Sequence, residues 1–446
     1  MRVRSAFVLL HRWVGLTIAG FLFIAGSTGA VISWDHELDD WLNPHLAFVD
    51  SRGPYLPPLS LVETVERSDP RAKVTFVSLL AEKGKAISFF VYPRIDPATG
   101  KLYQLDYNQV FLDPVTGEIL GRREWGKPAL DPAHLVPFLY KLHYSLHVPI
   151  MWGTDRVGIW LMGGVALIWI VDCFVGFYLT LPGPQARRKA APQLARPVQP
   201  SGGRTWWRRW QPAWRIKWRG SSYRVNFDIH RAFGLWFWVF LLILAISSAS
   251  LNLYTEVAQP IVNAVSSVTP TPFDQRVARP FDQPSTPRIS YAEALARARA
   301  EAARRGWREP AGTLFYSVLH DVYAIAFFEP GDDHGAAGVG PAELYLDGAD
   351  GHLLGDRIPW TGTGGDLFLQ IQFPLHSGRI AGLPGRIFIS FTGLAVATLS
   401  VTGVVIWWRK RRARRPPRRV IAAGRAAIGA DNSRPKDGAA GAGRGT

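Results

Sequence analysis

The stretch His11-Arg12-Trp13-Val14-Gly15-Leu16 recurs as His230-Arg231-Ala232-Phe233-Gly234-Leu235, and each copy opens a long apolar run. A second pair of matching stretches lies further along, Val110-Phe111-Leu112-Asp113 and Leu344-Tyr345-Leu346-Asp347, each followed by a glycine-containing turn. Apolar alternation that enters and leaves an Asp and Gly turn is typical of a β-hairpin. Matching motifs in matching order predict an internal two-fold repeat.

Four uncharged or nearly uncharged runs are long enough for the bilayer core, which needs about 20 helical residues. They are residues 13–34, 157–181, 232–254 and 387–408, and Asp172 is the one formal charge within them. The sequence therefore predicts an α-helical membrane protein in which the repeat forms a four-helix transmembrane bundle.

Positive charge flanks these runs rather than forming a nucleic-acid surface. The net charge is +16, and the arginines gather before the first run, between the second and third, and after the fourth. By the positive-inside rule both termini and the middle loop are cytoplasmic. The segment from Met1 to Ser33 also fits a signal peptide. We favour a span, because the run is long for a signal peptide and its loss would leave three spans with conflicting charges.

The hairpin regions would then lie outside the membrane as two α+β domains, with helical stretches before each hairpin. We expect this order of segments: 1–34 cytoplasmic start and first span; 35–141 first periplasmic domain; 142–182 second span; 183–228 basic cytoplasmic linker; 229–254 third span; 255–373 second periplasmic domain; 374–410 fourth span; and 411–446 disordered cytoplasmic tail.

Five of the eleven histidines mark the ends of the expected spans: His11 and His230 at the cytoplasmic side, and His143, His147 and His376 at the outer side. A lone interfacial histidine is usually solvated by headgroups, but equivalent positions in both halves favour a site. Haem iron has axial positions on opposite faces, which suit imidazoles from facing helices. We therefore expect two haem b groups, one held by the cytoplasmic pair and one by the outer histidines.

The outer ligand from the second span is ambiguous. Counting from the upstream Asp and Gly turn aligns His143 with His376, whereas counting back from the following Gly and Arg region favours His147. We choose His143. The two histidines stand at i and i+4 and share a helix face, so His147 is then a supporting or substrate-side group.

Neighbouring residues fit a bound macrocycle. Gly15 and Gly234 each stand at i+4 from a paired histidine, on the same face, where a missing side chain lets a flat ring approach. Arg12 and Arg231 would pair with propionates or serve as ordinary anchors at the interface. Asp172 would hold a ligand imidazole, relay a proton or pair with one of these arginines.

Other chemistries find less support. The single cysteine, Cys173, excludes a C-x-x-C-H haem attachment and a thiolate cluster. Zinc is a rival metal, but two histidines per face are few for a closed site. Dinucleotide-binding and Walker A motifs are absent from the sequence, so electrons must come from another carrier.

The stretches HRWVGL (11–16), HRAFGLW (230–236), LHYSL (142–146) and PLHSGRIAGLPGR (374–386), with hairpins DPVTGEILG and DGADGHLLG, make the chain resemble the PepSY-associated transmembrane family over roughly residues 5 to 410. This family includes iron-regulated membrane proteins and two-haem siderophore reductases of bacterial inner membranes. The resemblance implies two periplasmic PepSY-like domains, His11 and His230 on an inner haem, and His143 and His376 on an outer one. The flavin-binding extension of some relatives is missing.

The expected function is a haem-containing inner-membrane reductase that passes electrons from a cytoplasmic reductase or quinol to a periplasmic ferric siderophore or other iron chelate. No nucleic-acid partner is expected. One rival is a non-redox PepSY-domain regulator or scaffold, in which the histidines are dispensable. Another is an iron-chelate transporter, against which we count few polar groups in the spans and no broken helix.

Overall fold

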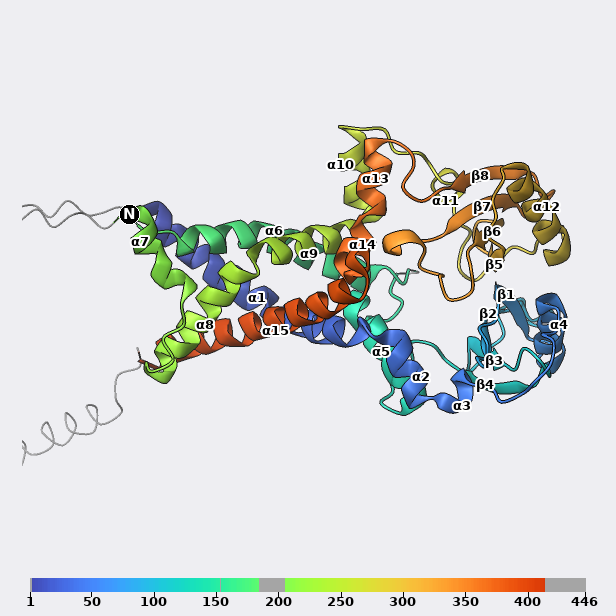
Figure 1. The fold of residues 1–446 in the computed structure, drawn as a ribbon, viewed down its shortest axis with the longest axis horizontal. Coiled ribbons are helices and arrows are strands. Elements are labelled where there is room, and N and C mark those ends of the chain that lie inside the picture. Colours follow the sequence, from blue (N-terminus) through green and yellow to red (C-terminus); the bar gives the residue numbers. More distant parts are fainter. Residues whose placement is uncertain (1, 153, 184–204, 414–446) are drawn as a thin grey trace, which may run out of the picture.

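Long helices fill one end of the molecule and a β-sheet lies at the other (Figure 1). This computed structural model describes residues 2–152, 154–183 and 205–413. Part of the expected basic linker and almost all of the expected tail lie outside the described residues.

Three helices of the described chain are long and apolar enough to cross a membrane: α1 (Arg2–Ile32), α6 (Val157–Thr180) and α15 (Gly382–Ala413). A fourth candidate consists of α8 (Ser222–Trp236) and α9 (Trp238–Asn252), which pass the same test together. α1 packs against α15 and α6, α6 packs against α9, and α8 packs against α15. These helices confirm that the chain is a membrane protein.

The third expected span is not one continuous helix. α8 and α9 meet at Phe237 with a bend of 68°. Trp236 donates its indole hydrogen bond to the Trp214 carbonyl, 3.2 Å away, while Trp238 donates to the Cys173 carbonyl at 3.0 Å. These anchors on different elements hold the two helices in different directions. The expectation that no span is broken was therefore wrong, and it no longer argues against a transporter.

One antiparallel sheet contains all eight strands of the described residues, in the order β4-β3-β2-β1-β5-β6-β7-β8. The two halves of the chain contribute four strands each and join where β1 pairs with β5, with Val77 opposite Leu314. The two expected domains thus share a sheet. Their strands are β1 (Ala72–Ser78), β2 (Ile87–Pro93), β3 (Gln109–Leu112), β4 (Ile119–Arg123), β5 (Ala311–Ser317), β6 (Val322–Phe327), β7 (Ala342–Asp347) and β8 (Leu353–Arg357).

Both predicted hairpins are confirmed as β3–β4 and β7–β8. In their turns, Asp113 accepts from the Val115 amide at 2.7 Å and Asp347 from the Ala349 amide at 2.6 Å. Gly117, with φ of 77°, takes the left-handed conformation that such a turn requires.

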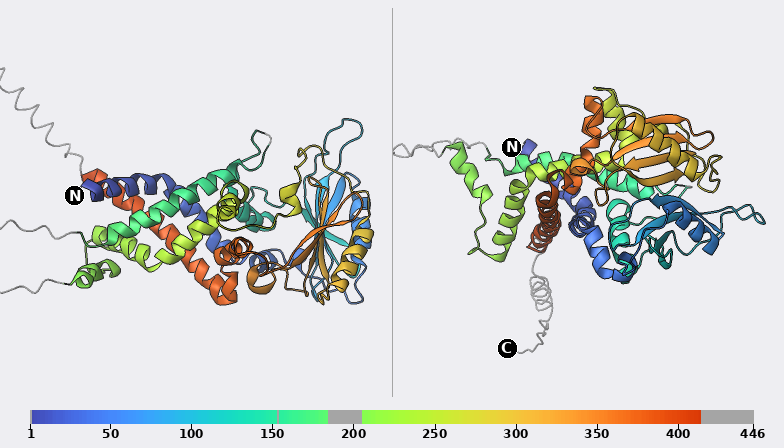
Figure 2. Two further views of the ribbon diagram at one scale, coloured as in Figure 1. Left: turned by 90° about the horizontal axis from the view of Figure 1, so that it is seen from above. Right: turned by 45° about the vertical axis from the view of Figure 1, so that its right-hand side comes forward.

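Two helices, α4 (Pro58–Ser68) and α12 (Tyr291–Arg304), cover the face of the sheet that points away from the long helices (Figure 2). Their apolar sides pack into one core with the strands, and Val65 and Ala298 are fully buried there. The Tyr291 hydroxyl donates to the Val74 carbonyl, so a helix of the second half also binds a strand of the first.

The remaining elements are short. They are α2 (Asp35–Leu42), α3 (Pro44–Ala47), α5 (Pro132–Ser145), α7 (Trp206–Trp210), α10 (Gln259–Asn263), α11 (Pro272–Gln275), α13 (Gly364–Gln370), α14 (Gln372–Ser377), the 3-10 helices η1 (Gln211–Trp214), η3 (Ala336–Gly338) and η4 (Arg379–Ala381), and the π-helix η2 (Tyr254–Ala258).

Glycines bring α1 and α15 into close contact. A Cβ atom built on Gly26 would lie 2.6 Å from the Gly393 carbonyl oxygen, and one on Gly393 would lie 2.6 Å from the Gly26 oxygen. Small residues at such a crossing let helix backbones approach in a membrane.

Beyond the crossing, Arg386 of α15 donates to Glu37 of α2 at 2.7 Å. This bond is the main cause that lowers the pKa of Glu37 to about 2.

Replacing Gly26 or Gly393 by alanine should force α1 and α15 apart and destabilise the protein by about 1–3 kcal/mol. The matched control is Gly20→Ala, also in α1, because a Cβ there meets nothing within 4 Å. Denaturation midpoints in detergent compare the three variants with the wild type. Equal midpoints for Gly20→Ala and Gly26→Ala would contradict the close helix contact.

Candidate functional site

Four histidines from both halves of the chain meet in two pairs. The sheet-distal pair is His11 of α1 and His230 of α8, with ring centres 6.2 Å apart. The sheet-proximal pair is His143 of α5 and His376 of α14, with ring centres 5.9 Å apart. These are the pairings expected from the sequence, and their role as metal ligands stays a prediction. The sheet-proximal histidines lie on short helices that precede the long ones, rather than on the first turns of the spans.

The two pairs lie far apart along the helices. His143 contacts Thr28, which belongs to the same helix as His11, α1. At a rise of about 1.5 Å per residue, His11 and Thr28 are about 25 Å apart along the helix axis. This separation is comparable to the thickness of the bilayer core, which is about 30 Å.

In the sheet-distal pair, both Nδ1 atoms contact acceptors on the partner helices. Nδ1 of His11 lies 2.8 Å from the Asp172 carboxylate of α6. Nδ1 of His230 lies 3.1 Å from the Leu399 carbonyl and 3.0 Å from the Thr402 hydroxyl, both in α15. Of the contacts expected for Asp172, the structure has the one to an imidazole.

The sheet-proximal pair repeats this arrangement with neutral acceptors. Nδ1 of His143 lies 3.0 Å from the Ala25 carbonyl and 3.1 Å from the Thr28 hydroxyl. Nδ1 of His376 lies 3.0 Å from the Ser247 hydroxyl. Ser247 follows His230 at the same spacing in the sequence as Thr28 follows His11. The two hydroxyl contacts therefore occupy equivalent positions in the sequence repeat.

These contacts decide which ring nitrogen carries the proton. Carbonyl and carboxylate oxygens only accept, so Nδ1 donates in His11, His143 and His230. The Ser247 hydroxyl already donates to the Ile243 carbonyl at 2.8 Å, so it accepts from His376. A neutral imidazole that is protonated at Nδ1 has its lone pair on Nε2. In the neutral form, all four histidines thus keep the lone pair on Nε2, while the hydrogen bond on Nδ1 orients the ring.

A cavity of about 470 Å³ surrounds the sheet-distal pair, and its lining is mostly apolar. Gly15 and Gly234 line it: a Cβ on Gly15 meets nothing within 4 Å, and one on Gly234 meets only Leu399 at 4.0 Å. The missing side chains therefore keep space open on the helix faces that carry His11 and His230.

Cationic side chains line the same cavity: Arg4, Arg12, Arg231 and Lys410. Arg231 donates to the buried Asp228 carboxylate at 2.9 Å, yet its Nε is buried without a hydrogen-bond partner among the described residues. Arg12 has no hydrogen bond or ion pair within the described chain. Both arginines thus have donors left for an anionic group.

His147 lies apart from both pairs. It follows the end of α5 with φ of 54°, and its Nε2 lies 2.5 Å from the Gly126 carbonyl, to which it donates. Its ring packs against Phe138. Because Nε2 of His147 bonds to Gly126, this side chain fixes the segment that follows α5. The ring next to that of His376 belongs to His143.

Sequence reasoning missed the acceptors Leu399, Thr402 and Ala25, and two glycines beside the sheet-distal pair. A Cβ on Gly176 would lie 3.4 Å from Cε1 of His11, and one on Gly403 would lie 3.3 Å from Cε1 of His230. An alignment of the two halves could have found these glycines, since each lies near the end of the second long helix of its half. The carbonyl acceptors leave no side-chain signal.

The fold and these pairs define a membrane protein with an extramembrane β-sheet and histidines gathered at two levels of its helices. The chain belongs to the family described as the PepSY-associated TM region, whose model matches residues 8–410. The matched region includes all four paired histidines. No curated protein matches the sequence.

Proposed function

We propose that this protein is a haem-containing reductase of the bacterial inner membrane that passes electrons to a ferric siderophore or another iron chelate in the periplasm. The helices would form a four-helix bundle with an internal two-fold repeat, both termini in the cytoplasm and the sheet in the periplasm. The observation that carries the proposal is the arrangement of four imidazoles in two pairs, each with Nδ1 engaged and with no hydrogen bond to Nε2 from the described residues.

The pair geometry suits a metal with two axial imidazoles. Metal–nitrogen bonds of about 2 Å place the centres of two imidazoles on opposite sides of one metal about 6 Å apart. The ring centres of the two pairs are 6.2 Å and 5.9 Å apart. His11 and His230 would hold one haem b, and His143 and His376 a second one.

The sheet-distal cavity suits the rest of the group. Gly15 and Gly234 leave open space where a flat macrocycle would lie, and most of the lining is apolar. Arg12 and Arg231 have unused donors for two propionates, and Arg4 and Lys410 add positive charge. A zinc site would need more ligands than each pair supplies.

When bound, haem supplies reversible one-electron chemistry at its iron. The chain holds and orients the ligands, and its two levels of histidines connect the membrane faces. One electron from a cytoplasmic reductase or quinol converts Fe(III) in the chelate to Fe(II). Hard oxygen ligands suit Fe(III) better than Fe(II), so reduction weakens the chelate's hold on iron.

Purified protein should contain about two haems per chain, as expected from two pairs of axial ligands. Reduced-minus-oxidised absorption spectra with haem quantification measure this. His11→Ala, His230→Ala, His143→Ala and His376→Ala should each lose one haem. The matched control is His147→Ala, which should keep both because its Nε2 bonds to Gly126. Colourless protein from a haem-replete host would overturn the proposal and favour the non-redox regulator.

The two pairs should differ in redox potential, because a carboxylate raises the basicity of its imidazole more than a hydroxyl or carbonyl does. A haem held by His11 and His230 beside Asp172 would therefore have a lower midpoint potential than one held by His143 and His376. We expect Asp172→Asn to raise the midpoint potential of one haem and leave the other unchanged in a spectroscopic redox titration. Thr402→Val removes only a neutral acceptor of His230 and serves as the control. Identical titrations for Asp172→Asn and the wild type would contradict this assignment.

A further inference from the structure

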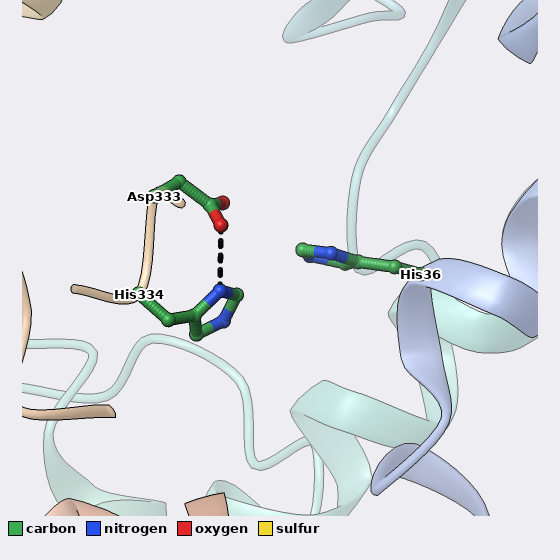
Figure 3. Close-up of side chains that lie close together, drawn as sticks. All are labelled: His36, Asp333 and His334. Carbon is green, nitrogen blue, oxygen red and sulfur yellow. Dashed lines mark hydrogen bonds and ion pairs between the residues drawn. The ribbon is translucent and has the colours of Figure 1, made fainter. Parts of the chain in front are cut away.

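A second group of ligand-type side chains lies outside the paired histidines. His36 is in the first turn of α2, while Asp333 and His334 belong to the segment between β6 and η3. Figure 3 shows the His36 ring pointing across a gap toward Asp333 and His334. One ligand atom from each of the three side chains lies within 4.8 Å of the others, and the two imidazole centres are 5.4 Å apart. Residues from both halves of the chain thus converge.

The fold fixes both sides of this group. Gly335 follows His334 with φ of 61°, and a Cβ there would overlap the Gly340 carbonyl oxygen, so only glycine fits. This close approach sets the path of the segment that carries Asp333 and His334. His36 lies in α2, which begins at Asp35, only three residues after α1 ends at Ile32.

The group lies next to the sheet-proximal pair. α2 packs against α5, which carries His143, and η3 packs against α14, which carries His376, and against η4. Arg379 of η4 lies 3.7 Å from the carboxylate of Asp35, the neighbour of His36. Both sides of the group therefore lie next to a helix that carries a histidine of the sheet-proximal pair.

Two imidazoles and one carboxylate are the donor set of open sites for divalent first-row metals such as Fe(II) and Co(II). Bonds of about 2.0–2.2 Å put neighbouring ligand atoms roughly 3–4 Å apart. Nδ1 of His334 lies 2.6 Å from Oδ1 of Asp333, to which it is hydrogen-bonded, so a metal ion would take the place of the proton in this bond. His36 and Asp333 are exposed, so their side chains can rotate to adjust the remaining distances. The Oδ1 atom of Asp35 is buried without a hydrogen-bond partner among the described residues, and its nearest cation there is Arg379 at 3.7 Å.

Another cluster of ligand-type residues, Asp347, Asp350 and His352, stabilises a turn of the second half. Asp347 bonds to Arg276 and caps the β7–β8 turn, and Asp350 accepts from the His352 amide at 3.0 Å. These carboxylates hold a turn within one half of the chain. The group is therefore a suitable control for nonspecific metal binding.

We propose that His36, Asp333 and His334 bind one divalent first-row metal ion between the two halves of the chain, beside the sheet-proximal pair. The identity of the ion rests on the proposed function: it is the Fe(II) that a reduced chelate releases. The remaining coordination positions stay open to water, so the ion can leave.

Equilibrium dialysis of the full-length, tag-free, chelator-washed protein in detergent with Co(II), followed by metal analysis, tests this site. We expect one saturable Co(II) per chain, with affinity lowered at least about 10-fold in His36→Ala and in His334→Ala. His352→Ala should bind like the wild type. Absence of saturable binding, or equal affinity in His36→Ala and the wild type, would overturn the proposal.

Haem content separates this result from the proposed function. His36→Ala should keep the wild-type haem content, which also shows that the variant is folded. His143→Ala should lose a haem and still bind Co(II). Failure of Co(II) binding in protein with both haems overturns the metal site alone, whereas Co(II) binding in a haem-free protein overturns the electron route alone.

Discussion

Each of the four paired histidines donates its Nδ1 proton to an acceptor on another helix, and this hydrogen bond is the constraint on which the site depends. It places a proton on Nδ1 and fixes the ring against rotation. Three of the histidines have backbone carbonyl or hydroxyl acceptors, and only His11 has a carboxylate, Asp172. The acceptors lie on neighbouring helices, so the orientation of each imidazole depends on how the helices pack.

Helix packing in turn depends on small residues. The mutual approach of Gly26 and Gly393 sets the distance between α1 and α15, and α1 carries both His11 and the acceptors of His143. The bend at Phe237 lets α8 follow α15 while α9 follows α6, so His230 reaches Leu399 and Ser247 reaches His376. A straight helix would be hard to fit to both partners at once. The shared sheet then joins the two halves beyond the helices through β1 and β5.

Local signals in the sequence predicted the apolar helices, both hairpins and the partner of each paired histidine. Repetition made this possible, because His11 and His230 begin the same motif and Asp113 and Asp347 begin the same turn. The pairing of Val77 with Leu314 was not predictable, since any edge strand of either half offers the same backbone donors and acceptors. Gly234 lies three residues before the break at Phe237, but the equivalent Gly15 lies within the continuous helix α1, so the glycine alone did not mark the break. His147 shares the spacing of a helical ligand, but the helix ends at Leu146 in a left-handed conformation.

Electron passage across a bilayer is the most direct test of the account. Proteoliposomes that contain a trapped reductant would be placed in a solution of ferric citrate with an impermeant Fe(II) indicator. The account predicts external Fe(II) with the wild type, and only the rate of protein-free vesicles with either His230→Ala or His376→Ala. Wild-type protein with two haems that gives no more Fe(II) than protein-free vesicles, or variants as fast as the wild type, would contradict a route through both pairs.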